Sequence, residues 1–163
     1  MAFERMHLAT NDLSERDRVP YMRDFYGRAI MGLDIAPIPE AVFDMEMNVA
    51  LLDQVGIASG KVSPITASRT QSLASDGNGN ILLGYYDAGF AHSDPRSGEM
   101  WVGGRDVVAM PLDQPFEWTF SGSGTTTAIH LDRKALAGLA PKYDLDGVNR
   151  LSPSRPGMDL LFP

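Results

Sequence analysis

The stretch that decides the fold runs from Gly89 to Pro115 and reads GFAHSDPRSGEMWVGGRDVVAMPLDQP. Short apolar or aromatic segments alternate in it with glycines, and a Gly-Arg-Asp turn at residues 104–106 precedes the apolar run 107–110. Glycine supplies the backbone conformations that tight turns require. The pattern therefore predicts a tight β-meander, in which one short strand follows another and glycine-containing turns connect them.

Strand signals continue on both sides of this meander. Apolar and polar residues alternate along residues 43–51 and again along 116–120, which is typical of strands with one buried face. Asp-Gly and Asn-Gly at residues 76–79 mark a turn that suits a tight hairpin. Further extended segments are expected at residues 34–39, 56–62, 66–73, 81–87 and 125–131, whereas residues 1–15 are expected to be irregular. Strands at this spacing indicate an all-β barrel or sandwich.

Helices are expected at three places outside these strands. The first begins at Val19-Pro20, with Pro20 in its first turn, and ends at Gly32. Asp132 is expected to cap a second helix over residues 133–140. A third begins at residues 154–156 and is followed by the apolar residues Met158, Leu160, Leu161 and Phe162. An apolar helix start that does not continue predicts that the chain is the front part of a longer protein.

Composition limits the classes of protein that the chain can represent. Its 163 residues suit a single domain with a real core, and it contains no cysteine and no apolar run of membrane-spanning length. A net charge of −7 argues against direct binding to a DNA phosphate backbone, which needs clustered lysine and arginine. The N-terminus lacks a basic start followed by an apolar stretch, so no signal peptide is expected and the predicted location is cytoplasmic.

Several segments together resemble the N-terminal, AraC-binding-like domain of AraC-type transcription regulators. Residues 14–27 are similar to the opening helix of that family, and Leu33-Asp34-Ile35 to its first strand. Residues 81–89, Gly98, Gly104, Asp106 and Pro115 follow its central glycine pattern. Residues 131–136 resemble the helix after the barrel, and residues 151–161 the helix next to the interdomain linker. The chain departs from the family in having Gly104-Arg105-Asp106 where Pro-Gly-Asp is common.

The resemblance implies a mostly β, cupin-like barrel with short flanking helices. Residues 1–150 would form an effector-binding and dimerisation domain, and residues 151–163 the start of a helix leading to a C-terminal helix-turn-helix domain absent from these residues. A small-molecule effector would shift the population of conformers in a homodimer and so control DNA binding by that absent domain. The resemblance implies no enzymatic activity, no cofactor and no membrane partner.

Two other readings stay open. A stand-alone cupin-like metal-dependent enzyme, an isomerase or dioxygenase, would need about three protein ligands for its metal. The chain has only His7, His92 and His130, and no second histidine lies near His92, so no metal site is predicted. We expect His92 at the surface or in a turn, and His130, between Ile129 and Leu131 on a strand, pointing outward or bonded locally. The third reading is an interaction domain with a closed barrel and no ligand.

Aromatic residues on the predicted strands suggest where a ligand would bind, because ligand pockets combine apolar walls with a few polar groups. Tyr85 and Tyr86 are adjacent on a strand, so one should face inward and the other outward. Arg69 would anchor an anionic effector, although a solvated arginine is the simpler expectation. The predicted ligand-binding residues are Arg69, Tyr85, Tyr86, His92, Trp101 and Trp118. Plain core packing is the competing interpretation for each aromatic residue.

Two apolar helix faces are candidates for a dimer interface. One lies on residues 135–140 and contains Ala135, Leu136 and Leu139, and the other contains Met22, Phe25 and Tyr26. Residue spacing alone fits both packing on the barrel and pairing with a second copy.

Overall fold

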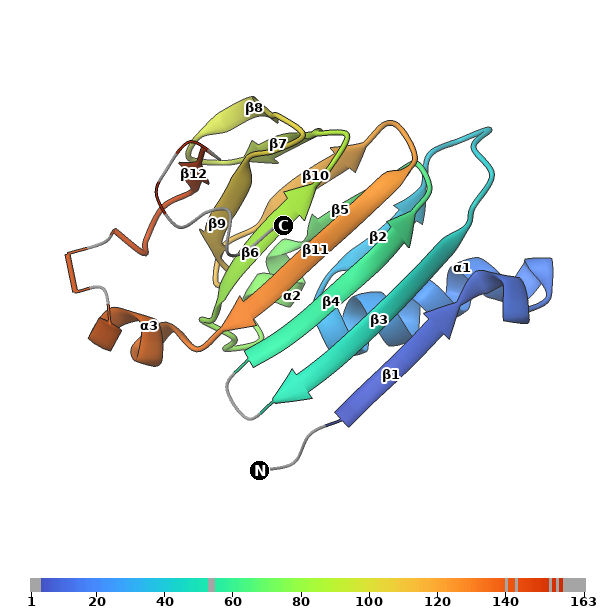
Figure 1. Cartoon of the computed structure of the whole chain (residues 1–163), viewed down its shortest axis with the longest axis horizontal. Helices are drawn as coiled ribbons and strands as arrows, with labels where there is room; N and C mark the ends of the chain where they lie inside the picture. Colours follow the sequence, from blue (N-terminus) through green and yellow to red (C-terminus); the bar gives the residue numbers. More distant parts are fainter. Residues whose placement is uncertain are drawn as a thin grey trace.

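The computed structural model describes residues 4–52, 55–139, 141–142, 144–152, 154 and 156, and consists of two facing antiparallel sheets (Figure 1). The seven-stranded sheet has the order β1 (Glu4–Ala9), β3 (Met45–Leu52), β4 (Val55–Val62), β11 (Gly124–Leu131), β6 (Ile81–Tyr86), β9 (Val107–Pro111) and β12 (Asn149–Leu151). The five-stranded sheet has the order β2 (Asp34–Pro37), β5 (Ile65–Arg69), β10 (Phe116–Phe120), β7 (Phe90–Asp94) and β8 (Gly98–Val102). This architecture confirms the predicted mostly β, cupin-like fold.

Short helices flank the sheets. They are the 3₁₀ turn η1 (Thr10–Asp12), α1 (Glu15–Tyr21), the π-helix η2 (Met22–Met31), α2 (Gln71–Ala74) and α3 (Arg133–Leu139). Within the described ranges, no helix is both long and apolar enough to cross a membrane.

The inner faces of the two sheets form the core. Along β3, Met45, Met47 and Val49 are buried and alternate with exposed residues, as the period-two pattern predicts. Phe116, Trp118 and Phe120 are the buried positions of β10 on the opposite sheet. The two sets of side chains pack against each other in one continuous apolar cluster.

The predicted continuous meander is only partly correct. β7 and β8 form a hairpin, but β9 pairs with β6 and β12 in the other sheet. The connection between them passes Gly104, where an added Cβ would lie 2.0 Å from the carbonyl oxygen of Asp87. Glycine is therefore required at this position by close backbone approach, because no side chain fits there. The Asp-Gly turn at residues 76–77 likewise joins α2 to β6 and so connects the two sheets, not two hairpin strands.

The N-terminal predictions need two corrections. Residues 4–9 are not irregular but form β1, which pairs along its whole length with β3. The first helix begins at Glu15 and not at Val19-Pro20, so Pro20 lies near the C-terminal end of α1. Ser14 occupies the N-cap position, and the backbone N–H of Asp17 donates to the Ser14 carbonyl oxygen at 2.9 Å. This earlier start displaces Pro20 from the first turn.

The helix continues without interruption from α1 into η2 and ends at Gly32, as predicted, in a left-handed conformation. Its wider π-helical turn places buried residues four to five positions apart, at Met22, Tyr26, Gly27 and Met31. Phe25, expected on the same face as Met22 and Tyr26 from a period of 3.6, is exposed instead. The strand expected over residues 66–73 is also shorter, because α2 begins at Gln71.

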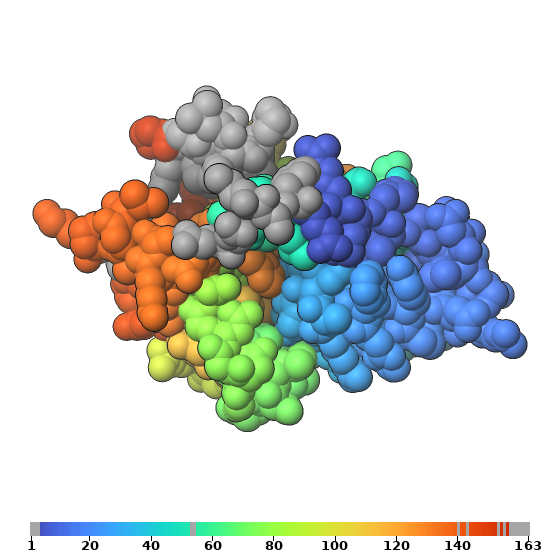
Figure 2. All heavy atoms as spheres, turned by 90° about the horizontal axis from the view of Figure 1, so that it is seen from below, coloured from blue at the N-terminus to red at the C-terminus, as the bar shows by residue number. Residues whose placement is uncertain are grey.

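Of the C-terminal elements, the helix α3 stands apart from the core, whereas β12 pairs with β9 in the seven-stranded sheet. The backbone N–H of Ala135 donates to Asp132 Oδ1 at 2.7 Å, which confirms the predicted cap of α3. No residue of α3 is buried, and the helix projects from one side of the molecule (Figures 1 and 2). β12 spans the boundary expected at residue 150, and most of the helix expected over residues 151–163 lies outside the described residues.

Candidate functional site in the space between the sheets

An aromatic layer fills the space between the two sheets. Trp118 packs on Phe90 and Phe116, with ring centroids 5.2 and 5.0 Å apart. Phe120 lies 4.7 Å from Tyr86 of the opposite sheet in an edge-to-face arrangement. Such pairs contribute about 0.5–1.5 kcal/mol beyond the burial of their area. The layer ties the two sheets together.

His92 belongs to this layer, which contradicts its predicted place at the surface. It is fully buried on β7, where it shares the inner face with Phe90 and Asp94. Trp118 Nε1–H donates to His92 Nδ1 at 3.0 Å, and His92 Nε2 lies 2.7 Å from Asp94 Oδ2. Because an indole nitrogen can only donate, Nδ1 must carry a lone pair and Nε2 must carry the proton. Both nitrogens are therefore occupied, and the imidazole orients Trp118.

Asp94 is the last member of this chain of hydrogen bonds, and its ionised carboxylate accepts the bond from His92. Burial raises the pKa of its carboxyl group, but the backbone N–H groups of Ser97 and Arg96 and the His92 side chain all favour the charged form. These hydrogen bonds outweigh the burial, so the pKa of Asp94 lies below its ordinary value. The Trp118 N–H, both ring nitrogens of His92 and both carboxylate oxygens of Asp94 therefore each have a hydrogen-bond partner.

A small cavity of about 40 Å³ lies beside Trp118 and Phe120. Its other walls include Tyr26 and Met31 from η2, Met45 from β3, and Thr126 and Ala128 from β11. A water needs about 10–15 Å³ measured in this way, so the cavity holds only a few waters. Gly84 explains part of this close packing, because a Cβ there would lie 2.6 Å from the Trp118 ring. The interior is thus nearly filled.

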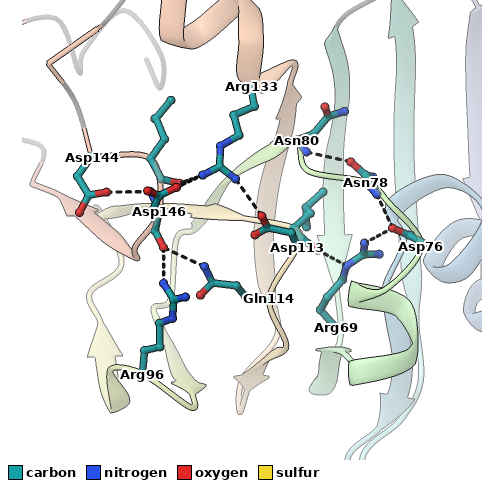
Figure 3. A network of polar contacts seen from close by, with 12 residues as sticks. Arg69, Asp76, Asn78, Asn80, Arg96, Asp113, Gln114, Arg133, Asp144 and Asp146 are labelled. Carbon is teal, nitrogen blue, oxygen red and sulfur yellow. Dashed lines mark hydrogen bonds and ion pairs between the residues drawn. The ribbon is translucent and has the colours of Figure 1, made fainter.

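Arg69 closes one end of the interior and is not the solvated arginine expected from the sequence. Its guanidinium is buried, and its three nitrogens donate to Leu112 O at 2.9 Å, Gly32 O at 2.7 Å and Asp76 Oδ1 at 2.8 Å. Figure 3 shows the bond to Asp76. Burial raises the pKa of Asp76, but the N–H of Asn78 and the Arg69 charge reverse this, and its pKa lies below the ordinary value. Arg69 therefore ties β5 to two segments distant in sequence, at Gly32 and Leu112, and to the nearby turn at Asp76.

His130 also faces the interior, contrary to the expected outward orientation. It alternates on β11 with Ile129 and shares the inner face with Thr126 and Ala128. Its Nε2 atom is buried and has no hydrogen-bond partner among the described residues. Burial, together with the nearby positive charge of Arg69, lowers the pKa of His130 to about 4. His130 is thus a neutral polar group with unused hydrogen-bonding capacity.

The two adjacent tyrosines face opposite sides of β6, as predicted. Tyr86 is buried and its hydroxyl donates to the carbonyl oxygen of Gly122, whereas Tyr85 is only partly buried on the other face. Burial and the charge of Asp87 raise the pKa of Tyr86 to about 12. Trp101 lies on the outer face of β8 and is 56% exposed.

The structure therefore brings together three of the six predicted ligand-binding residues, namely Tyr86, His92 and Trp118. Arg69 lies at one end of the same interior, and Tyr85 and Trp101 lie on outer faces. Sequence reasoning did not select Asp94 or Gly84. The sequence did contain the information that His92 and Asp94 point inward. Both lie an even number of residues from the apolar Phe90 on an alternating strand, so all three share one face.

No set of metal ligands is formed in the part of the chain that the structure describes. There, no three histidine, aspartate or glutamate side chains lie close enough together to hold a metal ion. His92, the best-placed imidazole in the interior, already uses both nitrogens. The donor set of a metal-dependent cupin enzyme is therefore not assembled by these residues.

A polar network joins this interior to the base of α3 (Figure 3). Leu112, whose carbonyl oxygen accepts from Arg69, is followed by Asp113, and Arg133 Nη1 donates to Asp113 Oδ2 at 3.0 Å. Arg133 also pairs with Asp146, whose carbonyl oxygen accepts from Arg96 at 3.0 Å and Gln114 at 2.9 Å. The first residue of α3 is thus held against the turn between β9 and β10.

These features define a cupin-like domain with an aromatic interior. The model of the AraC-binding-like domain matches residues 22–163, and the chain belongs to that family, which places it among regulatory ligand-binding domains. Among solved structures, the chain is similar to the AraC-like transcriptional activator CuxR, with 15% identity and a TM-score of 0.72. This match covers 97% of the chain but 57% of CuxR, so the chain spans little more than half of that protein.

Weaker similarities extend to cupins. A cupin 2 conserved barrel domain protein from Salinispora arenicola CNS-205 matches with 12% identity and a TM-score of 0.39, over 68% of this chain and 85% of that one. An RmlC-like cupin protein from Desulfovibrio desulfuricans matches with 13% identity and a TM-score of 0.39, over 59% of this chain and 93% of that one. No curated protein sequence matches the chain significantly. These weak similarities carry no argument about activity.

Proposed function

We propose that the chain is the ligand-sensing and dimerisation domain of an AraC-type transcription regulator. In this proposal a small-molecule effector controls DNA binding by a C-terminal domain that these residues do not include, and no chemical turnover occurs. The observation that carries the proposal is the family match over residues 22–163. The aromatic interior and the unburied helix α3 supply physical means for the two roles, and the proposed boundary between the sensing domain and the linker lies near residue 150.

The effector would enter the interior beside Trp118. The cavity of about 40 Å³ is too small for a metabolite, so binding requires neighbouring side chains to move. Met31 and Met45 line the cavity, and unbranched methionine side chains can adopt new rotamers at small cost. Tyr86, His92 and Trp118 would then contribute ring surfaces, since their polar atoms are already bonded, and His130 Nε2 would contribute the free polar contact.

The network at the base of α3 would carry the effect of the ligand to the dimer. A shift of Arg69 alters its bond to Leu112, and Asp113, the next residue, holds Arg133. Effector binding and dimerisation would thereby both favour the same position of α3 and so be coupled to each other. Asp113→Asn tests this step: it should leave effector binding intact and weaken the effect of the effector on dimerisation.

Dimerisation is tested on α3 itself. Leu139 is 85% exposed and Ala135 is also exposed, so this apolar face is available to a second copy. Leu139→Asp should convert dimers to monomers in analytical ultracentrifugation. Ala137→Asp, which adds the same charge on another exposed side of α3, is the matched control and should leave dimers intact. Equal behaviour of the two variants would reject α3 as the dimer interface.

Ligand sensing is tested through Trp118. The chain has two tryptophans, so Trp101→Phe leaves the buried one as the sole indole reporter. Heat should release a small-molecule fraction from purified protein, and adding that fraction back to refolded Trp101→Phe protein should shift the emission of Trp118. No shift at any concentration of the fraction would contradict ligand binding in the interior.

A second candidate function has one observation in its favour. The nearly filled interior fits an interaction domain with a closed barrel and no small ligand. That candidate predicts dimers in which Trp118 emission never responds to small molecules, so the two experiments together separate it from the sensor.

A further inference from the structure

The outer face of the five-stranded sheet carries an exposed indole beside two carboxylates. Trp101 on β8 is 56% exposed, so more than half of its indole surface is open to contact. Its ring rests against the turn at Gly89, where an added Cβ would lie 2.8 Å from the indole. A groove of about 450 Å³ runs beside it, with walls that include Ala91, Ser93, Glu99, Glu117 and Thr119.

The two glutamates face each other across a small residue. Glu99 on β8 pairs in register with Ser93 on β7, and Ser93 pairs with Glu117 on β10. The two carboxylate-bearing positions are therefore two strand spacings apart, or about 10 Å. Both side chains are exposed, and neither forms an ion pair with any described residue. The groove between them is floored by the short side chain of Ser93.

We propose that this groove binds a linear organic polyamine. One ammonium group would pair with Glu99 and a second with Glu117, while the methylene chain lies across Ser93. The exposed face of Trp101, next to Glu99, would cover the end of the chain and attract its charge through the ring. The site lies on the opposite face of the sheet from Trp118, so it does not depend on the interior effector site.

The negative charge of the groove favours a polyamine over other ligands. A second copy of the chain would bring the same pair of carboxylates to the interface, and like charges repel. A net charge of −7 likewise disfavours phosphate-bearing ligands. A monoamine can satisfy only one of the two glutamates. The spacing of Glu99 and Glu117 therefore favours a chain with at least two separated ammonium groups.

The test is a calorimetric titration of the whole chain with spermidine at physiological ionic strength, with n-butylamine as the single-charge comparison. Saturable spermidine binding is expected, with a dissociation constant about tenfold higher in a Glu99→Gln/Glu117→Gln variant because both ion pairs are lost. Glu4→Gln/Glu15→Gln removes two exposed charges elsewhere and should leave binding unchanged. Trp101→Leu should weaken binding while keeping the charge of the protein constant.

Three results would overturn the proposal. They are equal binding of spermidine and n-butylamine, equal weakening by the two double-glutamine variants, and an unchanged dissociation constant in Trp101→Leu. Because all substituted residues are exposed, the variants should keep the thermal stability of the parent chain, and that stability is measured alongside.

Discussion

The two tryptophans of the chain lie on opposite faces of one sheet and have opposite environments. Trp118 is buried among aromatic rings, and its N–H is bonded to His92. Trp101, one strand beyond His92 in the same sheet, is largely exposed and lies beside two glutamates that form no ion pair with any residue that the structure describes. Indole on the inner face thus stabilises the fold, whereas indole on the outer face is left available for contact. Residue type alone does not distinguish the two roles.

The largest expected effect comes from removing the inner indole. Trp118→Ala deletes a fully packed ring and leaves His92 Nδ1 without its donor, so the free energy of unfolding should fall by about 5 kcal/mol. Chemical denaturation monitored by circular dichroism measures this loss. A loss below about 1 kcal/mol would mean that the aromatic layer does not hold the sheets together.

Substitution of His92 should cause the second largest loss of stability. His92→Leu keeps the volume of the side chain but leaves the Trp118 N–H and one oxygen of Asp94 without a partner, at an expected cost of about 3 kcal/mol. His7→Leu, at an exposed position of β1, is the matched control and should cost little. Equal denaturation midpoints for the two variants would contradict the stabilising role of the Trp118–His92–Asp94 hydrogen bonds.

His130 should make stability depend on pH. Its pKa is about 4 in the folded chain and near 6.5 when unfolded, so between these values the unfolded chain binds the extra proton. The contribution of His130 to stability is therefore full above pH 6.5 and is lost as the pH drops toward 4, by on the order of 3 kcal/mol. His130→Leu should flatten the melting temperature between pH 6.5 and 4.5. An equally steep decline in this variant would assign the pH dependence to other groups.

The smallest effect is expected on the outer face. Trp101→Ala removes the same side chain as Trp118→Ala from the same sheet, but stability should change by less than about 0.5 kcal/mol because the ring is mostly exposed. The same denaturation experiment measures it. A loss as large as that of Trp118→Ala would erase the difference between the two faces.

Most strands could be predicted from the sequence, because a strand with one buried face has alternating apolar and polar residues, as in 43–51 and 116–120. β1 was missed although Met6 and Leu8 alternate with Arg5 and His7, since six residues give a weak signal. The start of α1 was misplaced because Pro20 was taken as a first-turn residue, whereas Ser14 was the better N-cap candidate. The switch into a π-helix has no simple sequence signature, so the buried face of η2 was assigned with the wrong period.

The site was less predictable than the fold. Inward and outward positions followed from alternation for Tyr85 and Tyr86. His130 was placed outward because it lies between the apolar residues Ile129 and Leu131, and His92 was placed at the surface or in a turn because no second histidine lies near it. Two of the three partners that stabilise Arg69 in the interior, Gly32 and Leu112, are distant in sequence, and only Asp76 is near. Such partners become visible only when the chain is folded. Polarity alone therefore predicts exposure poorly for residues with a dedicated acceptor or donor.

Native mass spectrometry of the purified chain, with metal analysis of the same sample, tests the central claim most directly. The account predicts a metal-free dimer, with a small-molecule adduct that is lost on unfolding and that shifts Trp118 emission when it is returned. A monomer without an adduct would contradict the sensing and dimerisation roles. A stoichiometric transition metal would contradict the regulatory reading and favour a metal-dependent enzyme.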